Sequence, residues 1–385
     1  MRVMISCGEP SGDIYAGALA REIRALDPSS VITGFGSDKL REAGATLVSD
    51  FSGLSVTGLL EVVRLLPKTY TTYRQLVAHA REQRPDVFVA IDFPDFNFRL
   101  AAAVRALGVP VVYYISPQLW AWRPGRMKTM RRIADKVLVI FPFEEAIYHQ
   151  AGVPVQWVGH PLLDAAPDHE SRDTFLGRHG IDPSKRIVAL LPGSRRNELR
   201  EILPDLLASA RLIAQAVPNV EFVLARAPHL PDDVFDPVRG AATDFRVTVI
   251  NGSADRLLAS AELALVASGT ITVQAALHEC PMVVVYRLSP ITYRLGRPFV
   301  TVDTFAMANL VAGRKVVPEL IQDDFTPEAV ARESAAILRN PGHAANVRSD
   351  LREVRRKLGP PGASRRAAEA VLAVAAGASA STGLR

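Results

Sequence analysis

The amino-acid sequence predicts an α/β protein made of two Rossmann-like domains, each built on a parallel sheet. The chain has 385 residues, which is long for a single hydrophobic core. Short apolar runs alternate with amphipathic segments, and the runs form two series that a polar stretch separates. In such a pair of domains we expect the active site in a cleft between the two sheets.

The expected strands are short runs rich in β-branched and aromatic residues. The first series is 3–6, 31–35, 86–91, 109–115, 136–141 and 155–159, and the second is 186–191, 220–226, 246–250, 262–267 and 282–287. Buried β-branched runs joined by helices are typical of a parallel sheet that helices cover on both faces. Helical patterns fill 17–26 and 99–107, and the chain after 325 is predicted to be largely helical, with a last helix at 365–376.

The bulk composition excludes several classes of protein. The net charge of +5 suits anionic substrates or an anionic membrane surface without choosing between them. Cys7 and Cys280 are too few for a disulfide scaffold or a cysteine metal site, and they fit a reducing cytosol. The N-terminal apolar run is too short for a signal peptide, and no segment has the roughly 18 apolar residues of a membrane span. We expect a cytoplasmic protein that meets a membrane only at its surface.

The stretch "GEPSGD" forms the first candidate turn between a strand and a helix. Gly8 and Gly12 allow a tight turn, and the helix N-terminus behind them offers backbone N–H groups. Glu9 and Asp13 would repel a phosphate, so this is not a dinucleotide site. Simple helix capping by Ser11 or Asp13 explains the pattern equally well.

The stretch "IDFPDFN" forms the second candidate turn. Asp92 ends a predicted buried strand, and Asp95 and Asn97 follow it. A carboxylate at the mouth of a parallel sheet can act as a general base if it reaches a substrate hydroxyl. Helix capping by Asp95 or Asn97 is the alternative.

The turn "PGSRR" follows the first strand of the second series. Gly193 and Ser194 make the turn, and Arg195 and Arg196 open the helix, so that two guanidinium groups and a helix N-terminus could clamp a diphosphate. A surface loop with solvated arginines is the alternative.

The turn "ASGT" offers a second anion site in the same domain. Ser268, Gly269 and Thr270 present hydroxyls and backbone N–H groups at a helix N-terminus, and Gln274 lies one turn further along the helix.

Two segments could bind a lipid or a membrane surface. Segment 54–70 is either an ordinary core-facing helix or a surface helix for acyl chains, through Leu59, Leu60, Val63 and Leu66. Segment 119–132 sets tryptophans beside cations, a pattern suited to an anionic membrane or a phosphorylated lipid, in Trp120, Trp122, Arg123 and Arg126. Such clusters also bind single-stranded nucleic acid, but no nucleic-acid module is recognisable, and we expect no such partner. His160 stands alone and is expected to be structural.

The motifs occur in a characteristic order: "GEPSGD", "IDFPDFN", "SPQLWAWRPGR", "FPFE", "VGHPLLD", "LLPGSRRNE", "ASGT", "CPMVVVYR" and "NLVAGRKVVPELIQ". From about residue 3 to 325 the chain resembles the lipid-A-disaccharide synthases, glycosyltransferase family 19. The resemblance implies a GT-B fold and a peripheral enzyme on the cytoplasmic face of the inner membrane. It also implies a dimer with exchanged C-terminal segments.

The implied reaction joins two acylated glucosamines. UDP-2,3-diacylglucosamine is the donor, 2,3-diacylglucosamine 1-phosphate is the acceptor, and the products are the β-1,6-linked disaccharide 1-phosphate and UDP. The resemblance assigns residues 1–164 to the acceptor and membrane side and 165–340 to UDP-sugar binding. Residues 341–385 are C-terminal helices that pack back on the first domain or are exchanged in a dimer. The polar stretch 164–186 is the expected linker.

The family's functional residues carry over by motif. The catalytic set is Asp95, Glu9 and Asp13, and the donor-binding set is Gly193, Ser194, Arg195, Ser268, Gly269, Thr270, Gln274, Arg287 and Asn309. The sequence departs from the family pattern at two positions. Gln274 replaces a glutamate that holds the ribose hydroxyls, and Ala308 replaces a proline before Asn309.

We expect an inverting displacement in which Asp95 is the base and Arg195 and the 268–270 turn stabilise the leaving UDP. No cofactor is expected, because no carboxylate or histidine cluster has metal-ligand spacing. The alternatives are another GT-B UDP-sugar enzyme, such as an epimerase or a transferase with a different acceptor, and a non-catalytic nucleotide-sugar sensor or membrane scaffold.

Overall fold

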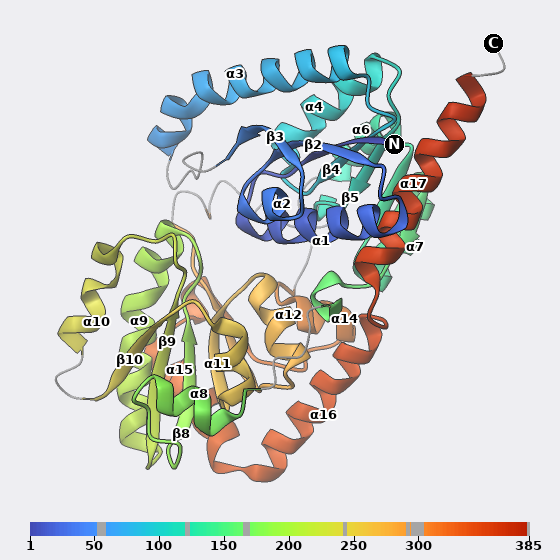
Figure 1. Cartoon of the computed structure of the whole chain (residues 1–385). Helices are drawn as coiled ribbons and strands as arrows, with labels where there is room; N and C mark the ends of the chain where they lie inside the picture. The colour runs from blue at the N-terminus through green and yellow to red at the C-terminus, as the bar shows by residue number, and fades with distance from the viewer. Residues whose placement is uncertain are drawn as a thin grey trace. The chain divides into compact units, whose positions relative to one another are not determined.

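The computed structural model describes the backbone of residues 1–51, 59–119, 124–164, 170–241, 245–289, 293 and 304–382. The side chains of 59–66, 124, 241 and 378–382 also lie outside the description. The chain divides into two compact units (Figure 1). Unit one is Met1–Ala165 with Leu358–Arg385, and unit two is Ala166–Lys357.

Unit one is built on a seven-stranded sheet in which every neighbouring pair is parallel. In sheet order its strands are β3 (Thr46–Asp50), β2 (Val31–Gly36), β1 (Arg2–Ser6), β4 (Val87–Ile91), β5 (Val111–Tyr114), β6 (Lys136–Val139) and β7 (Val155–Trp157). Its helices are α1 (Pro10–Leu26), α2 (Asp38–Glu42), α3 (Leu59–Gln83), α4 (Pro94–Ala106), α6 (Met127–Ile133), α7 (Pro142–Gln150) and α17 (Ala363–Thr382).

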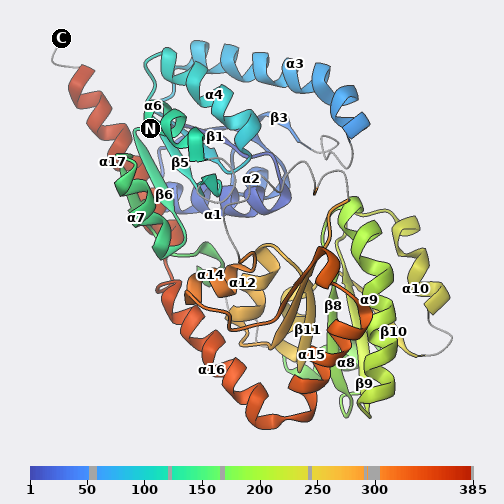
Figure 2. The ribbon, with the colours of Figure 1, turned by 180° about the vertical axis from the view of Figure 1, so that it is seen from behind.

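The central strands of unit one are buried on both faces, because helices cover each side of the sheet. Every residue of β4 and β5 is buried. Helix α1, with α17 packed against it, lies on one face, and α3 and α4 lie on the other (Figures 1 and 2).

Unit two repeats the plan with six parallel strands. In sheet order they are β10 (Val247–Asn251), β9 (Val220–Arg226), β8 (Arg186–Leu191), β11 (Leu263–Ala267), β12 (Met282–Tyr286) and β13 (Glu319–Ile321). Its helices are α8 (Arg172–Arg178), α9 (Arg196–Ala216), α10 (Asp236–Ala241), α11 (Ala254–Ser260), α12 (Thr270–Leu277), α14 (Met307–Ala312), α15 (Pro327–Arg339) and α16 (Pro341–Lys357). Helices α9 and α15 cover the face toward the viewer in Figure 2, and α8 and α11 cover the other.

Both sheets reverse their strand order once, between β1 and β4 in unit one and between β8 and β11 in unit two. Ligands of open parallel sheets bind outside the carboxyl ends of the strands at such a switch point. The four turns that the sequence singles out follow β1, β4, β8 and β11. Each switch point therefore has a candidate turn on both sides.

The predicted α/β class with two parallel Rossmann-like sheets is confirmed, and strands β8 and β9 have the predicted bounds. Strands β3 and β13 were not predicted, because β3 is a half-buried edge strand with only two apolar residues in a row and β13 is the short segment Glu-Leu-Ile, of which only Leu320 is buried. The stretch 164–186, expected as the linker, contains the boundary between the units after Ala165, and it also contains α8, which buries Phe175 and Leu176. No helix of the described residues is long and apolar enough to cross a bilayer.

Helix α17 is fastened to the loop around His160 in unit one. The Asp164 carboxylate accepts hydrogen bonds from the amides of Gly362, Ala363 and Ser364 at 2.6, 3.0 and 2.7 Å. These are the amide just before α17 and the first two amides of the helix, so Asp164 caps α17 from a segment about 200 residues earlier in the chain. Arg366 adds a hydrogen bond to the Val158 carbonyl at 2.8 Å.

Candidate active site

The turn after β1 is held by a buried carboxylate. Asp13 is 3% exposed and accepts hydrogen bonds from the amides of Ser37 and Lys39, both at 2.8 Å, and of Leu40 at 3.3 Å. It therefore caps the N-terminus of α2 from inside α1. Glu9 is half-buried at the N-cap of α1. Of the two carboxylates, only Glu9 is placed to reach solvent.

The turn after β4 has an unusual backbone that an asparagine stabilises. Asp92 and Phe93 both adopt left-handed φ values, 43° and 50°. The buried Asn97 donates to the carbonyls of Ile91 and Asp92 at 3.1 and 2.9 Å. Its Oδ1 accepts from the Ser6 hydroxyl at 2.7 Å, which joins the ends of β1 and β4. Asn97 is thus a structural residue of the first switch point.

Gly8 is needed for this arrangement. A Cβ at Gly8 would lie 2.3 Å from the Phe93 ring, so no larger residue fits while Phe93 keeps its place. The two candidate turns of unit one therefore pack directly on each other.

Asp95 lies in the first turn of α4 and is 78% exposed. Its Oδ1 accepts a hydrogen bond from Arg126 Nη2 at 2.6 Å, and the Arg126 guanidinium lies 5.6 Å from the centroid of the Phe98 ring. Arg126, predicted for the membrane side, is thus brought to the predicted catalytic aspartate. The contact joins the "PDFN" and "WRPGR" motifs.

In unit two, a carboxylate occupies the turn after β8. Glu198 Oε2 accepts hydrogen bonds from the amides of Ser194 at 3.0 Å and Arg195 at 3.2 Å. Its Oε1 lies 3.5 Å from Arg195 Nη1. Gly193 has φ +122°, and a Cβ there would lie 2.3 Å from Glu198 Oε2. The amides of Ser194 and Arg195, which the sequence offers to a phosphate, are therefore engaged by Glu198.

Arg196 is fixed differently from Arg195. It forms an ion pair with Asp233, which belongs to the segment after β9, and His229 of that segment lies 2.9 Å from the Ser194 carbonyl. The alternative of a merely solvated Arg196 is therefore wrong. Arg195 is 57% exposed, and Arg196 connects the turn to its neighbour.

The turn after β11 remains open to solvent. Gly269 and Thr270 are exposed at the N-cap and first position of α12, and the amides of a helix's first turn have no acceptor inside the helix. The Thr272 amide donates to the carbonyl of the N-cap Gly269 at 3.0 Å. The Ser268 hydroxyl donates to the Phe305 carbonyl at 3.2 Å, and Gln274 is half-buried one turn into α12. An anion can reach this helix terminus.

Two of the predicted donor-binding residues are engaged inside unit two. Arg287 forms an ion pair with Asp205, donates to the Phe325 carbonyl, and lies 4.7 Å from the centroid of the Phe325 ring. Asn309 is 1% exposed. Its Oδ1 accepts from the amides of Val316 and Val317 at 2.7 and 3.0 Å, and its Nδ2 donates to Glu319 Oε1 at 2.6 Å. Both residues therefore shape the surrounding loops.

His160 is structural, as expected. It is 1% exposed, its Nδ1 accepts from the Leu162 amide at 3.2 Å, and burial lowers its pKa to about 3. The predicted membrane residues Trp120, Trp122 and Arg123 lie outside the described residues. So do the side chains of Leu59, Leu60, Val63 and Leu66.

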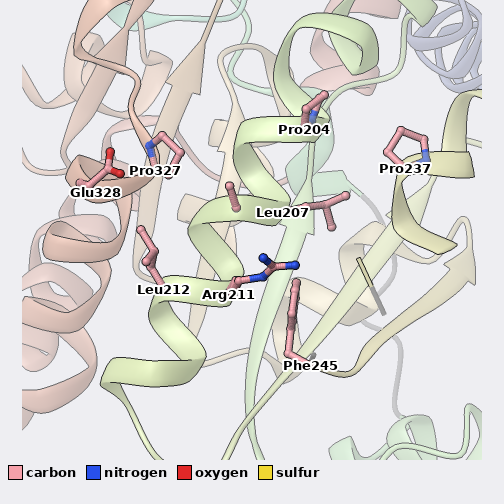
Figure 3. Close-up of a pocket in the computed structure, with 9 residues that line it drawn as sticks. Pro204, Leu207, Arg211, Leu212, Pro237, Phe245, Pro327 and Glu328 are labelled. Atoms are coloured by element: carbon pink, nitrogen blue, oxygen red, sulfur yellow. The ribbon is translucent and has the colours of Figure 1, made fainter. Parts of the chain in front are cut away.

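A surface pocket of unit two lies away from these turns. It runs along the middle of α9 toward α10 and α15 and is lined by Pro204, Leu207, Ala208, Arg211, Leu212, Pro237, Phe245, Pro327 and Glu328 (Figure 3). None of the residues of the four turns lines it. Across the described ranges, no group of three or more His, Cys, Asp or Glu side chains has the arrangement of a metal site.

Sequence reasoning missed Glu198 as the partner of its turn. The available signal was a glutamate three residues after the helix N-cap, which is the capping-box position. The partners of Asp13 and Arg287 come from segments that no local pattern connects, whereas those of Asn309 lie within its own motif, 7 to 10 residues further along the chain.

Comparison with known proteins agrees with this geometry. The family model for "Lipid-A-disaccharide synthetase" matches residues 3–374. The lipid-A-disaccharide synthase of Geobacter sulfurreducens is 41% identical over 374 residues, covering 96% of each chain. That of Koribacter versatilis is 43% identical over 380 residues, covering 97% of this chain and 99% of its own.

Solved structures show the same fold at low identity. The UDP-GlcNAc 2-epimerase of Neisseria meningitidis bound to UDP-GlcNAc has a TM-score of 0.69 at 14% identity, covering 97% of this chain and 100% of its own. The glycosyltransferase of kitacinnamycin has a TM-score of 0.63 at 16% identity, covering 97% and 98%. These likenesses establish the GT-B type of fold. The sequence matches along nearly the whole chain establish the family as well. The chain belongs to the lipid-A-disaccharide synthase family of glycosyltransferases.

Proposed function

We propose that the chain transfers 2,3-diacylglucosamine from its UDP derivative to the 6-hydroxyl of 2,3-diacylglucosamine 1-phosphate. The products are the β-1,6-linked disaccharide 1-phosphate and UDP. The observation that carries this proposal is the match to lipid-A-disaccharide synthases over residues 3–374. It is supported by the positions of the family's motifs beside both switch points.

The UDP part of the donor binds at the switch point of unit two. The exposed residues Gly269 and Thr270 lie at the N-terminus of α12, whose backbone N–H groups form a positive helix end that favours a phosphate. Glu198 engages the amides of the β8 turn, so the Arg195 guanidinium is the group of that turn that meets the diphosphate. Gln274 forms a hydrogen bond with a ribose hydroxyl, as acceptor or as donor. It lacks the negative charge of the family's usual glutamate.

The acceptor is activated at the switch point of unit one. Asp95 takes the proton of the 6-hydroxyl while that oxygen bonds to the anomeric carbon and the bond from this carbon to the UDP oxygen breaks. The attack comes from the face opposite UDP, which inverts the anomeric configuration. Arg126 orients the Asp95 carboxylate through Oδ1. Asp13 is a positioning residue, because both of its oxygens cap α2.

The departing UDP carries negative charge, which Arg195 and the N-terminus of α12 stabilise. Holding the two sugars together makes the displacement effectively intramolecular. None of these steps requires a metal ion.

The enzyme acts as a peripheral protein on an anionic cytoplasmic membrane surface. Helix α6, which follows the tryptophan segment in the sequence, buries Met130 and Ile133 and exposes Lys128, Arg131 and Arg132. Sedimentation with phosphatidylglycerol vesicles tests this, since binding should fall as salt rises and be absent with phosphatidylcholine alone. A homodimer with exchanged C-terminal segments is tested by sedimentation velocity.

The reaction itself is tested by incubating the enzyme with both acylated glucosamines and following UDP and disaccharide together. Equal amounts of UDP and disaccharide 1-phosphate are expected. Release of UDP without disaccharide, or an epimerised UDP-sugar without stoichiometric UDP, would overturn the proposal.

A further inference from the structure

The donor side of unit two contains a carboxylate beside the group proposed to bind the diphosphate. The Glu198 side chain is 16% exposed, and its two oxygens serve different partners. Oε2 accepts from the amides of Ser194 and Arg195, and Oε1 lies 3.5 Å from the Arg195 guanidinium. A negative group at this position opposes a diphosphate, so its presence needs a physical reason.

The backbone contacts supply that reason. The turn at 192–195 must leave a buried strand and enter α9 within four residues, with Gly193 at φ +122°. Two amide hydrogen bonds of 3.0 and 3.2 Å fix this path. Because Arg195 is the N-cap of α9, the same bonds fix where its side chain starts.

We propose that Glu198 is a positioning residue of the donor site, which holds the 192–195 turn and presents Arg195 to the donor's diphosphate. This inference rests on the proposed UDP binding. The contact between Oε1 and the guanidinium is at the limit of hydrogen-bond length, and Arg195 is 57% exposed. The diphosphate therefore takes over the guanidinium while the two amides stay with Glu198.

The Glu198 side chain has two opposing effects on UDP affinity. As a hydrogen-bond acceptor, Glu198 favours UDP binding because it shapes the turn. As a negative charge, it weakens UDP binding through repulsion and through competition for Arg195. Glu198→Gln keeps an acceptor oxygen and removes the charge, whereas Glu198→Ala removes both.

The two variants should therefore change UDP affinity in opposite directions. We expect the dissociation constant for UDP to fall about fivefold in Glu198→Gln, from the lost repulsion near an exposed site. We expect it to rise about tenfold in Glu198→Ala, from the released amides. Uridine, which lacks the diphosphate, should bind all three proteins within about twofold of one another.

Isothermal titration with UDP and with uridine tests this on the full chain. Glu201→Gln is the matched control, because it removes the same charge from the next turn of α9 and should leave UDP affinity within about twofold. Thermal melts confirm that the variants are folded. Weaker or unchanged UDP binding in Glu198→Gln, or uridine affinities that follow those of UDP, would overturn the inference. If the unmodified chain fails to bind UDP, the proposed function fails instead.

Discussion

Removing the Asn309 side chain should lower the stability of unit two, because Asn309 holds a buried loop and does not contact the ligand directly. Asn309 is 1% exposed, and its Oδ1 accepts from the amides of Val316 and Val317, which are 8% and 2% exposed. Its Nδ2 donates to the Val317 carbonyl at 2.9 Å and to Glu319. Asn309→Ala leaves two buried amides without acceptors, each at roughly 1–3 kcal/mol, so a loss of about 3 kcal/mol is expected after partial hydration.

For a unit of this size, about 3 kcal/mol lowers the melting temperature by roughly 6–12 °C. Scanning calorimetry measures it, and the shift should fall on the transition of unit two. Glu319 also accepts from the amides of Phe305 and Ala306, so loosening this cluster disturbs the segment that meets the Ser268 hydroxyl. Activity should therefore fall together with stability.

Asn309→Asp is the informative companion. It keeps the acceptor for Val316 and Val317 but places a second carboxylate where Nδ2 now lies 2.6 Å from Glu319 Oε1. It should be at least as unstable as Asn309→Ala. If both variants melt within about 1 °C of the unmodified chain while UDP affinity falls tenfold, Asn309 contacts the ligand and the structural reasoning is refuted.

Three further predictions concern chemistry and pH. Asp95→Asn should cut turnover by orders of magnitude with UDP affinity nearly intact, and near-normal turnover would exclude Asp95 as the base. Activity should persist in EDTA; complete loss that a divalent ion restores would contradict the metal-free displacement. His160 has a pKa lowered to about 3 by burial, so unfolding takes up a proton there below about pH 6.5. Its contribution to stability is complete above that pH and falls by up to about 1.4 kcal/mol per pH unit toward pH 3, and His160→Asn should flatten the measured slope.

The central strands of both sheets could be predicted from sequence because they are buried on both faces. Strands β8 and β9 are apolar runs apart from Arg186, Glu221 and Arg226, and their bounds were predicted correctly. Strand β3 carries Thr, Ser and Asp on a half-buried edge, and such a segment has no distinctive pattern. Helices α1 and α4 begin at Pro10 and Pro94, earlier than their apolar periodicity indicates, because proline fits the first helical turn.

The four turns of the candidate site could be predicted, because each combines a strand end with glycine or polar residues before a helix. Apart from Glu198, whose capping-box position gave a signal, the partners of the candidate site's side chains could not be predicted. Arg287 meets Asp205 of α9, and Asp13 meets amides of α2. Such contacts depend on how the chain returns after tens of residues, which no local spacing encodes.

Hydrogen–deuterium exchange with and without UDP tests the central claim most directly, namely that the switch point of unit two holds the nucleotide. Exchange should slow in peptides that cover 268–274, where the first amides of α12 meet the diphosphate. Peptides covering 8–13 and 92–97 in unit one should be unchanged by UDP alone. Protection confined to those unit one turns, or no protection at 268–274 with UDP bound, would contradict the assignment.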